Sequence, residues 1–157
     1  EEKQLIDSSR IVISGNSAGG LTALTALYKT DIFKAAFCKY PVIDLNDMRL
    51  NTHRFERKYL NSLIGNYENN QERYYERSPK NNLDKINKPI LIFHGRQDSV
   101  INFKESVDFH KKLLEKNVYS EIVLFDEEGH GFKNIQNKII VLERTEKFLK
   151  YIFSFKN

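Results

Sequence analysis

The chain has 157 residues, of which 40% are hydrophobic and 29% are charged, and its formal net charge is +4. This length and composition predict one soluble globular domain with a single core. The basic residues are scattered among nearly as many acidic ones, which argues against a nucleic-acid partner, and no apolar run approaches the roughly 20 residues that span a bilayer. One cysteine, Cys38, excludes an internal disulfide, and no Cys/His cluster has the spacing of zinc ligands.

The predicted elements alternate between strands and helices. Strands are expected at residues 10–14, 35–40, 89–95 and 122–125, and helices at residues 18–28, 102–116 and 136–154. The run at 89–95 is apolar throughout, which is typical of a strand buried on both faces of a parallel sheet. Strands that alternate with helices predict an α/β fold: a mostly parallel sheet with flanking helices.

Helical periodicity indicates which side chains of the last two helices face the core. We expect inward stripes of Phe103, Val107, His110 and Leu114 in one helix and of Ile139, Leu142, Leu149 and Ile152 in the other. Residues 49–78 are polar and rich in Tyr and Arg, with a helical period only around Leu60, Leu63 and Ile64. Cys38 lies in an apolar run and is expected to be a buried structural thiol.

A glycine-rich turn, Gly15-Asn16-Ser17-Ala18-Gly19-Gly20, separates the first strand from the first helix. Gly-x-Ser-x-Gly between a strand and a helix is typical of a nucleophile elbow, which holds the serine at the tip of a strained turn. Gly15 and Gly19, helped by Ala18 and Gly20, would let the strand and helix close on each other. Ser17 is therefore predicted to be a nucleophile, with the Ala18 backbone N–H as an oxyanion donor. The alternative is that Ser17 only caps the helix.

A serine nucleophile needs a general base and a carboxylate that orients this base. Asp98 follows the strongest strand, at the edge of a parallel sheet where active sites form. His130 follows the last strand, between two glycines that free its backbone. The order Ser17, Asp98, His130 is that of α/β-hydrolases.

Other residues compete for these roles. Asp98 could instead cap the next helix, although Asn102 is better placed, and Asp44 is a rival acid. His94 is expected to make local hydrogen bonds at the end of a buried strand, and His110 to pack in the core. His53 is expected on the surface or in a pocket wall.

With these motifs, the chain resembles the catalytic domain of the prolyl oligopeptidase family, in its acylaminoacyl-peptidase and dipeptidyl-aminopeptidase-like branch. The resemblance runs from Arg10 to about Phe153, and the segments that carry it are 15–22, 52–56, 59–60, 63–65, 75–79, 84–86, 89–95, Asp98 and 128–132. It implies an α/β-hydrolase fold, with Ser17 as nucleophile, Asp98 as acid and His130 as base. It also implies short peptide substrates and neither a metal nor an organic cofactor, and it allows for a homodimer.

The same resemblance implies that residues 1–157 are a C-terminal portion of the domain, with strands 5–8 of the eight-stranded sheet. The first four strands, a β-propeller and the second oxyanion donor would then be absent. Residues 10–14 would form an exposed apolar edge, so we expect the chain alone to be weakly stable and poorly active. The single cysteine fits a reducing compartment, and we expect a cytoplasmic location.

Three other functions stay open at this point. A carboxylesterase could use the same triad, because a fold does not fix a substrate. The chain could be an inactive truncated module, or residues 49–78 could bind a polyanion, although the acidic residues there dilute the charge. Arg77-Ser78-Pro79 and the segment around His130 favour the peptidase.

Overall fold

The structure, a computed structural model, describes residues 6–51 and 60–154. The motif at residues 52–56, with His53, and Tyr59 lie outside the described residues. Within the described part, no helix combines the length and the apolar character needed to cross a membrane.

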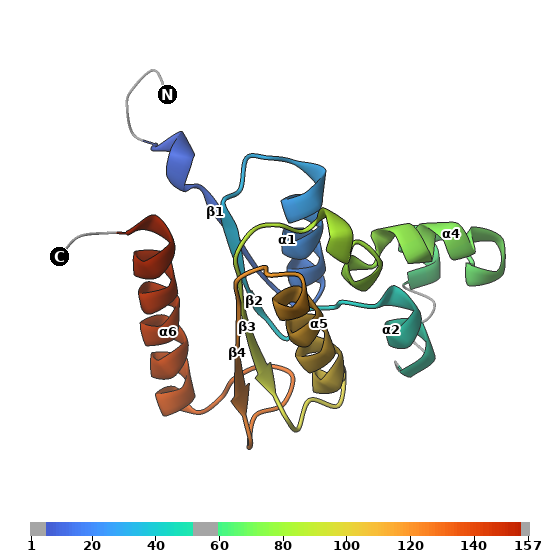
Figure 1. Cartoon of the computed structure of the whole chain (residues 1–157). Helices are drawn as coiled ribbons and strands as arrows, with labels where there is room; N and C mark the ends of the chain where they lie inside the picture. Colours follow the sequence, from blue (N-terminus) through green and yellow to red (C-terminus); the bar gives the residue numbers. More distant parts are fainter. Residues whose placement is uncertain (1–5, 52–59, 155–157) are drawn as a thin grey trace.

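A four-stranded parallel sheet forms the centre of the molecule (Figure 1). Its strands, in spatial as well as sequence order, are β1 (Val12–Asn16), β2 (Ala35–Lys39), β3 (Ile90–Gly95) and β4 (Ser120–Phe125). The prediction of an α/β fold with a parallel sheet is therefore confirmed. Because the strands are parallel, the segments that follow β1, β3 and β4 leave from the same edge of the sheet. Among the described residues, β1 is an outer strand that pairs only with β2, as expected for residues 10–14.

Helices cover both faces of the sheet (Figure 1). Helices α1 (Ala18–Lys29) and α5 (Phe103–Glu115) lie on one face, and α6 (Ile135–Phe153) lies on the other. The side chains of β3 alternate between the two cores: Ile90 and Ile92 belong to the α1/α5 cluster, whereas Leu91 and Phe93 pack in the α6 cluster. All six residues of β3 are buried, in keeping with the apolar run from Ile90 to Phe93; His94, which follows this run, is a buried polar residue.

Two further helices, α2 (Leu45–Asn51) and α4 (Tyr67–Arg77), extend to one side of the sheet (Figure 1). They form a third apolar cluster with the helical residues 60–64, and its buried members are Val42, Leu45, Leu60, Ile64, Tyr74 and Ile101. The sequence predicted neither helix. In α4 only Tyr74 is buried, and the helix contains no aliphatic residue from which a buried stripe could be predicted.

The predicted inward faces of α5 and α6 were partly wrong. Helix α5 buries Ser106, Phe109 and Leu113, whereas Leu114 is 48% exposed. Helix α6 buries Phe148, and Leu149 and Ile152 pack beside it as expected, but Leu142 is 70% exposed. Apolar side chains occupy adjacent rows of each helix, so periodicity alone left the angle of the buried stripe open by about one residue.

The short 3-10 turns complete the described chain. They are η1 (Ser8–Arg10), η2 (Pro79–Asn81) and η3 (Leu83–Lys85). Ser78, in the Arg77-Ser78-Pro79 motif, is buried: its hydroxyl donates to the Tyr74 carbonyl (2.7 Å) and accepts from the Leu45 amide (3.0 Å). The motif thus joins α4 to α2.

Candidate active site

Ser17 lies between β1 and α1 in a strained backbone conformation, with φ 53° and ψ −120°. Few non-glycine residues adopt positive φ, and they persist there only where the surroundings hold them. The Ser17 N–H donates to the Lys39 carbonyl (3.0 Å), and the Ser17 carbonyl accepts from the Gly20 and Val42 amides (2.9 and 3.2 Å). The Ser17 side chain makes no capping hydrogen bond, so its alternative role as a helix cap was wrong. The Ser17 hydroxyl is therefore not engaged with the helix.

Two glycines allow the close approach of strand and helix at this turn. A β-carbon on Gly15 would lie 2.0 Å from the Gly19 carbonyl oxygen, and one on Gly20 would lie 2.6 Å from Pro41 Cβ. Space at Gly19 itself is open, with no atom within 4 Å of a β-carbon there. The prediction was therefore right for Gly15 and wrong for Gly19, because it is the Gly19 backbone, not its missing side chain, that faces the strand.

The structure brings Ser17, His130 and Asp98 together from three separate loops. The Nε2 atom of His130 lies 3.0 Å from Ser17 Oγ, and its Nδ1 atom lies 2.9 Å from Asp98 Oδ2. Each residue follows a different strand: β1 for Ser17, β3 for Asp98 and β4 for His130. Ala18, whose N–H is the predicted oxyanion donor, is exposed beside Ser17.

The Asp98 side chain is fully buried yet fully hydrogen-bonded. Its Oδ1 accepts from the backbone amides of Val100 and Ile101 (2.9 Å each), and its Oδ2 faces His130 and His94 (2.9 and 3.2 Å). Burial by itself would raise the pKa of this carboxyl, but these hydrogen bonds outweigh it and hold the pKa well below its ordinary value. Asp98 therefore stays ionised. Asn102 caps α5 by accepting from the Lys104 amide, so Asp98 is not that cap.

The His130 segment is shaped by one glycine and by aromatic packing. Gly131 has φ 112°, which side chains rarely tolerate, whereas Gly129 has no positive φ. Only one of the two glycines thus supplies the predicted freedom. The Tyr40 ring packs against the His130 imidazole with centroids 4.6 Å apart, and the Phe132 ring packs edge-on against Tyr40. These contacts fix the plane of the imidazole.

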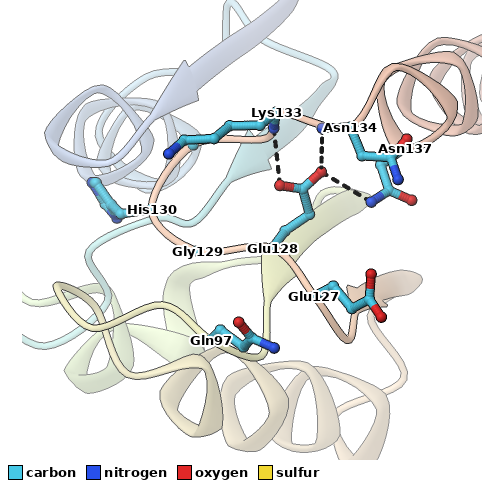
Figure 2. A pocket seen from close by; sticks show the side chains of 9 residues that line it. Gln97, Glu127, Glu128, Gly129, His130, Lys133, Asn134 and Asn137 are labelled. Carbon is cyan, nitrogen blue, oxygen red and sulfur yellow. Dashed lines mark hydrogen bonds between the residues drawn. The ribbon is translucent and has the colours of Figure 1, made fainter.

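Glu128 holds the segment around His130 in place through three hydrogen bonds (Figure 2). Its buried carboxylate accepts from the Lys133 and Asn134 amides and from the Asn137 side chain, each at 2.9 Å. Burial would raise the pKa of Glu128, but the hydrogen bonds, that from Asn137 first, lower it below its ordinary value. The hollow that Glu128 lines measures about 370 Å³. Because all of these partners come from the chain itself, the carboxylate ties the His130 segment to the start of α6. The sequence analysis did not predict this role.

Asp44 and His110, which were also considered for the acid and the base, have partners outside the site formed by Ser17, His130 and Asp98. Asp44 pairs with Lys80 and accepts from the Asn46 amide, so it is engaged away from His130. His110 is only partly buried, and its Nδ1 contacts Ser120 Oγ (2.9 Å). Cys38 is buried as expected, and burial raises the pKa of its thiol to about 12. Among residues 6–51 and 60–154, no group of three His, Cys, Asp or Glu side chains could hold a metal ion.

A family model described as the prolyl oligopeptidase family matches residues 1–156. The chain belongs to the prolyl oligopeptidase family. Dipeptidyl aminopeptidase BIII of Pseudoxanthomonas mexicana is 30% identical over 89% of this chain, and the acylamino-acid-releasing enzyme of Rattus norvegicus is 21% identical over 86%. The chain spans about a fifth of these relatives: 21% of the first and 19% of the second.

A solved protein of similar structure is a puromycin-hydrolyzing peptidase of Mycobacterium tuberculosis. It is 34% identical, with a TM-score of 0.93, over 99% of this chain and 24% of that chain. The expected resemblance to this family and the α/β-hydrolase fold of its members are thus confirmed, and the parallel sheet described above is part of that fold.

Proposed function

We propose that this chain carries the nucleophile, base and acid of a serine peptidase, namely Ser17, His130 and Asp98. The observation that supports this proposal is the continuous hydrogen-bonded path from Asp98 Oδ2 through both ring nitrogens of His130 to Ser17 Oγ. Membership in a family of peptidases supports the reaction class.

Each group in this path has a chemical task. His130 Nε2 accepts the hydroxyl proton as Ser17 Oγ attacks the carbonyl carbon of the substrate. Asp98 keeps the other proton on Nδ1 and stabilises the imidazolium that forms. The Ala18 N–H donates to the developing oxyanion. His130 then protonates the leaving amine, and water hydrolyses the acyl-enzyme.

The substrates we propose are short peptides, or peptides with an acyl or aminoacyl end. The names of two relatives, a dipeptidyl aminopeptidase and an acylamino-acid-releasing enzyme, support this class. A carboxylesterase with the same triad is the alternative, since ester cleavage needs the same groups.

We also propose that residues 1–157 are the C-terminal portion of a longer hydrolase, corresponding to strands 5–8. The small share of each relative that the chain spans supports this, as does the place of β1 at an edge of the described sheet. The rest of the fold would supply the second oxyanion donor. A homodimer and a cytoplasmic location stay predictions.

The first experiment measures covalent labelling of the 157-residue chain by a fluorophosphonate probe. We expect labelling in the wild type, none in Ser17→Ala, and a strong loss in Asp98→Asn. Asp44→Asn is the matched control and should label at the wild-type rate, because Asp44 pairs with Lys80. Labelling that survives Ser17→Ala would contradict the assignment of the nucleophile.

The second experiment separates peptidase from esterase. Hydrolysis of puromycin and of an aminoacyl amide is compared with that of the matching ester. Amide turnover supports the peptidase, whereas cleavage of the ester alone would reject it. Turnover by the isolated chain at the rates of whole family members would contradict the proposal that it is a portion of the enzyme.

A further inference from the structure

We infer that His94 is a positioning residue for Asp98, a role that rests on the proposed function and extends the triad by one buried side chain. His94 is the fifth residue of β3 and is fully buried. Its Nε2 atom lies 3.2 Å from Asp98 Oδ2, the same oxygen that receives His130 Nδ1. Two histidines therefore meet at one carboxylate oxygen.

The partners of His94 determine its tautomer. Nε2 also lies 3.1 Å from the Ile101 carbonyl oxygen, which can only accept a hydrogen bond. Nε2 therefore carries a proton, which it donates to the Ile101 carbonyl, and Asp98 Oδ2 lies 3.2 Å from the same nitrogen. Nδ1 is then an acceptor, and Ser106 Oγ, at 2.8 Å, donates to it. Ser106 is itself buried on α5, so the His94 ring has a partner at both nitrogens.

This arrangement completes the hydrogen bonding of the Asp98 carboxylate. Two backbone amides hold Oδ1, while Oδ2 accepts from His130 Nδ1 and lies 3.2 Å from His94 Nε2. Without His94, Oδ2 would be buried with His130 as its only donor. The Asp98 carboxylate could then rotate so that Oδ2 no longer accepts the hydrogen bond from His130 Nδ1. A series of polar contacts thus runs from Ser106 on α5 through His94, Asp98 and His130 to Ser17.

Core filling alone would predict a different result from positioning. A core-filling His94 would matter for its volume, whereas a positioning His94 matters for a donor at the place of Nε2. The variants His94→Gln and His94→Asn distinguish the two roles. Gln can carry an amide N–H to the place of Nε2, whereas the shorter Asn reaches only the place of Nδ1.

The first readout is the rate of fluorophosphonate labelling as a function of pH. We expect His94→Asn to slow labelling by about ten- to hundredfold, the effect of one hydrogen bond to a charged group, and His94→Gln to restore most of the rate. His110→Asn is the matched control, since His110 also contacts a serine, Ser120, but is not bonded to Asp98. It should label like the wild type.

The second readout does not depend on reactivity at Ser17. Long-range proton–nitrogen NMR spectra give the fraction of neutral His130 with its proton on Nδ1. This tautomer should dominate in the wild type and in His94→Gln, and should fall in His94→Asn. Circular dichroism verifies that each variant is folded, and each folded variant is compared with the wild type.

The outcomes separate the inference from the proposed function. Equal fractions of the His130 Nδ1–H tautomer in folded His94→Asn and in the wild type would overturn the positioning role. A wild type in which neutral His130 carries its proton mainly on Nε2 would overturn it too. If neither the wild type nor any variant is labelled, but the His130 tautomer shifts as expected, the positioning role stands and the proposed function fails for the isolated chain.

Discussion

Gly15 and the carbonyl of Gly19 approach each other so closely that a β-carbon on Gly15 would lie 2.0 Å from the Gly19 oxygen. We expect Gly15→Ala to push β1 and α1 apart, at a cost of about 1–3 kcal/mol or more in the free energy of unfolding. Because the Ser17 backbone lies in this turn, fluorophosphonate labelling should also fall at least tenfold. Urea denaturation and labelling rates measure both effects.

Gly19→Ala is the matched control for this prediction. The space beside Gly19 is open, and the residue lies in the first turn of α1, where alanine favours the helix by roughly 0.5–1 kcal/mol over glycine. We therefore expect unchanged or increased stability. A Gly19→Ala variant that loses as much stability as Gly15→Ala would contradict the geometry of the turn.

Removal of the Glu128 carboxylate should loosen the His130 segment. In Glu128→Ala the Lys133 and Asn134 amides and the Asn137 side chain lose a charged acceptor, and a hydrogen bond to a charged group contributes about 1.5–3 kcal/mol. We expect lower thermal stability and at least tenfold slower labelling of Ser17. The neighbouring Glu127 is exposed, so Glu127→Ala should change neither quantity. Equal effects of the two substitutions would refute the anchoring role.

Protonation of Asp98 should destabilise the fold in acid. Hydrogen bonds lower the pKa of this buried carboxyl in the folded state below its ordinary value of 3.8. The folded state therefore binds fewer protons than the unfolded state. The contribution of ionised Asp98 to the free energy of unfolding is complete when the pH is above 3.8, and it is lost progressively as the pH falls below that value.

Urea denaturation between about pH 5 and pH 2 measures this contribution. We expect the free energy of unfolding to depend less steeply on pH in Asp98→Asn than in the wild type. Some slope remains, because the pKa of Glu128 is also lowered. Asp126→Asn, at an exposed surface aspartate, should keep the wild-type slope. An unchanged slope in Asp98→Asn would contradict the depressed pKa.

The Cys38 thiol should resist alkylation in the folded chain. Burial raises its pKa to about 12, so almost no thiolate forms near neutral pH, and the reagent has no access to the sulfur. We expect iodoacetamide to modify Cys38 rapidly only after unfolding in urea, as measured by mass spectrometry. Rapid modification of the native protein would show that β2 is less well covered than the structure indicates.

Local sequence determined most of the sheet and the candidate site. The apolar run of β3 predicts a strand buried on both faces, and helices do cover both faces of the sheet at this strand. The meeting of Ser17, Asp98 and His130 could be predicted because each lies in a segment that follows a strand, with residue types that suit its proposed task. Parallel strands then bring those segments to one edge.

Only the tertiary structure decided which face each helix buries and what supports the site. Helix α4 has one buried residue, Tyr74, and no aliphatic residue, so no apolar stripe could be predicted from its sequence. His94 and Glu128 were not predicted as supports, because their roles depend on hydrogen bonds to atoms of other loops and of α5 and α6. Short motifs determine the chemistry of a side chain at its own position. Its partners are fixed only when separate segments pack, because hydrogen bonds require contact in space and not nearness in sequence.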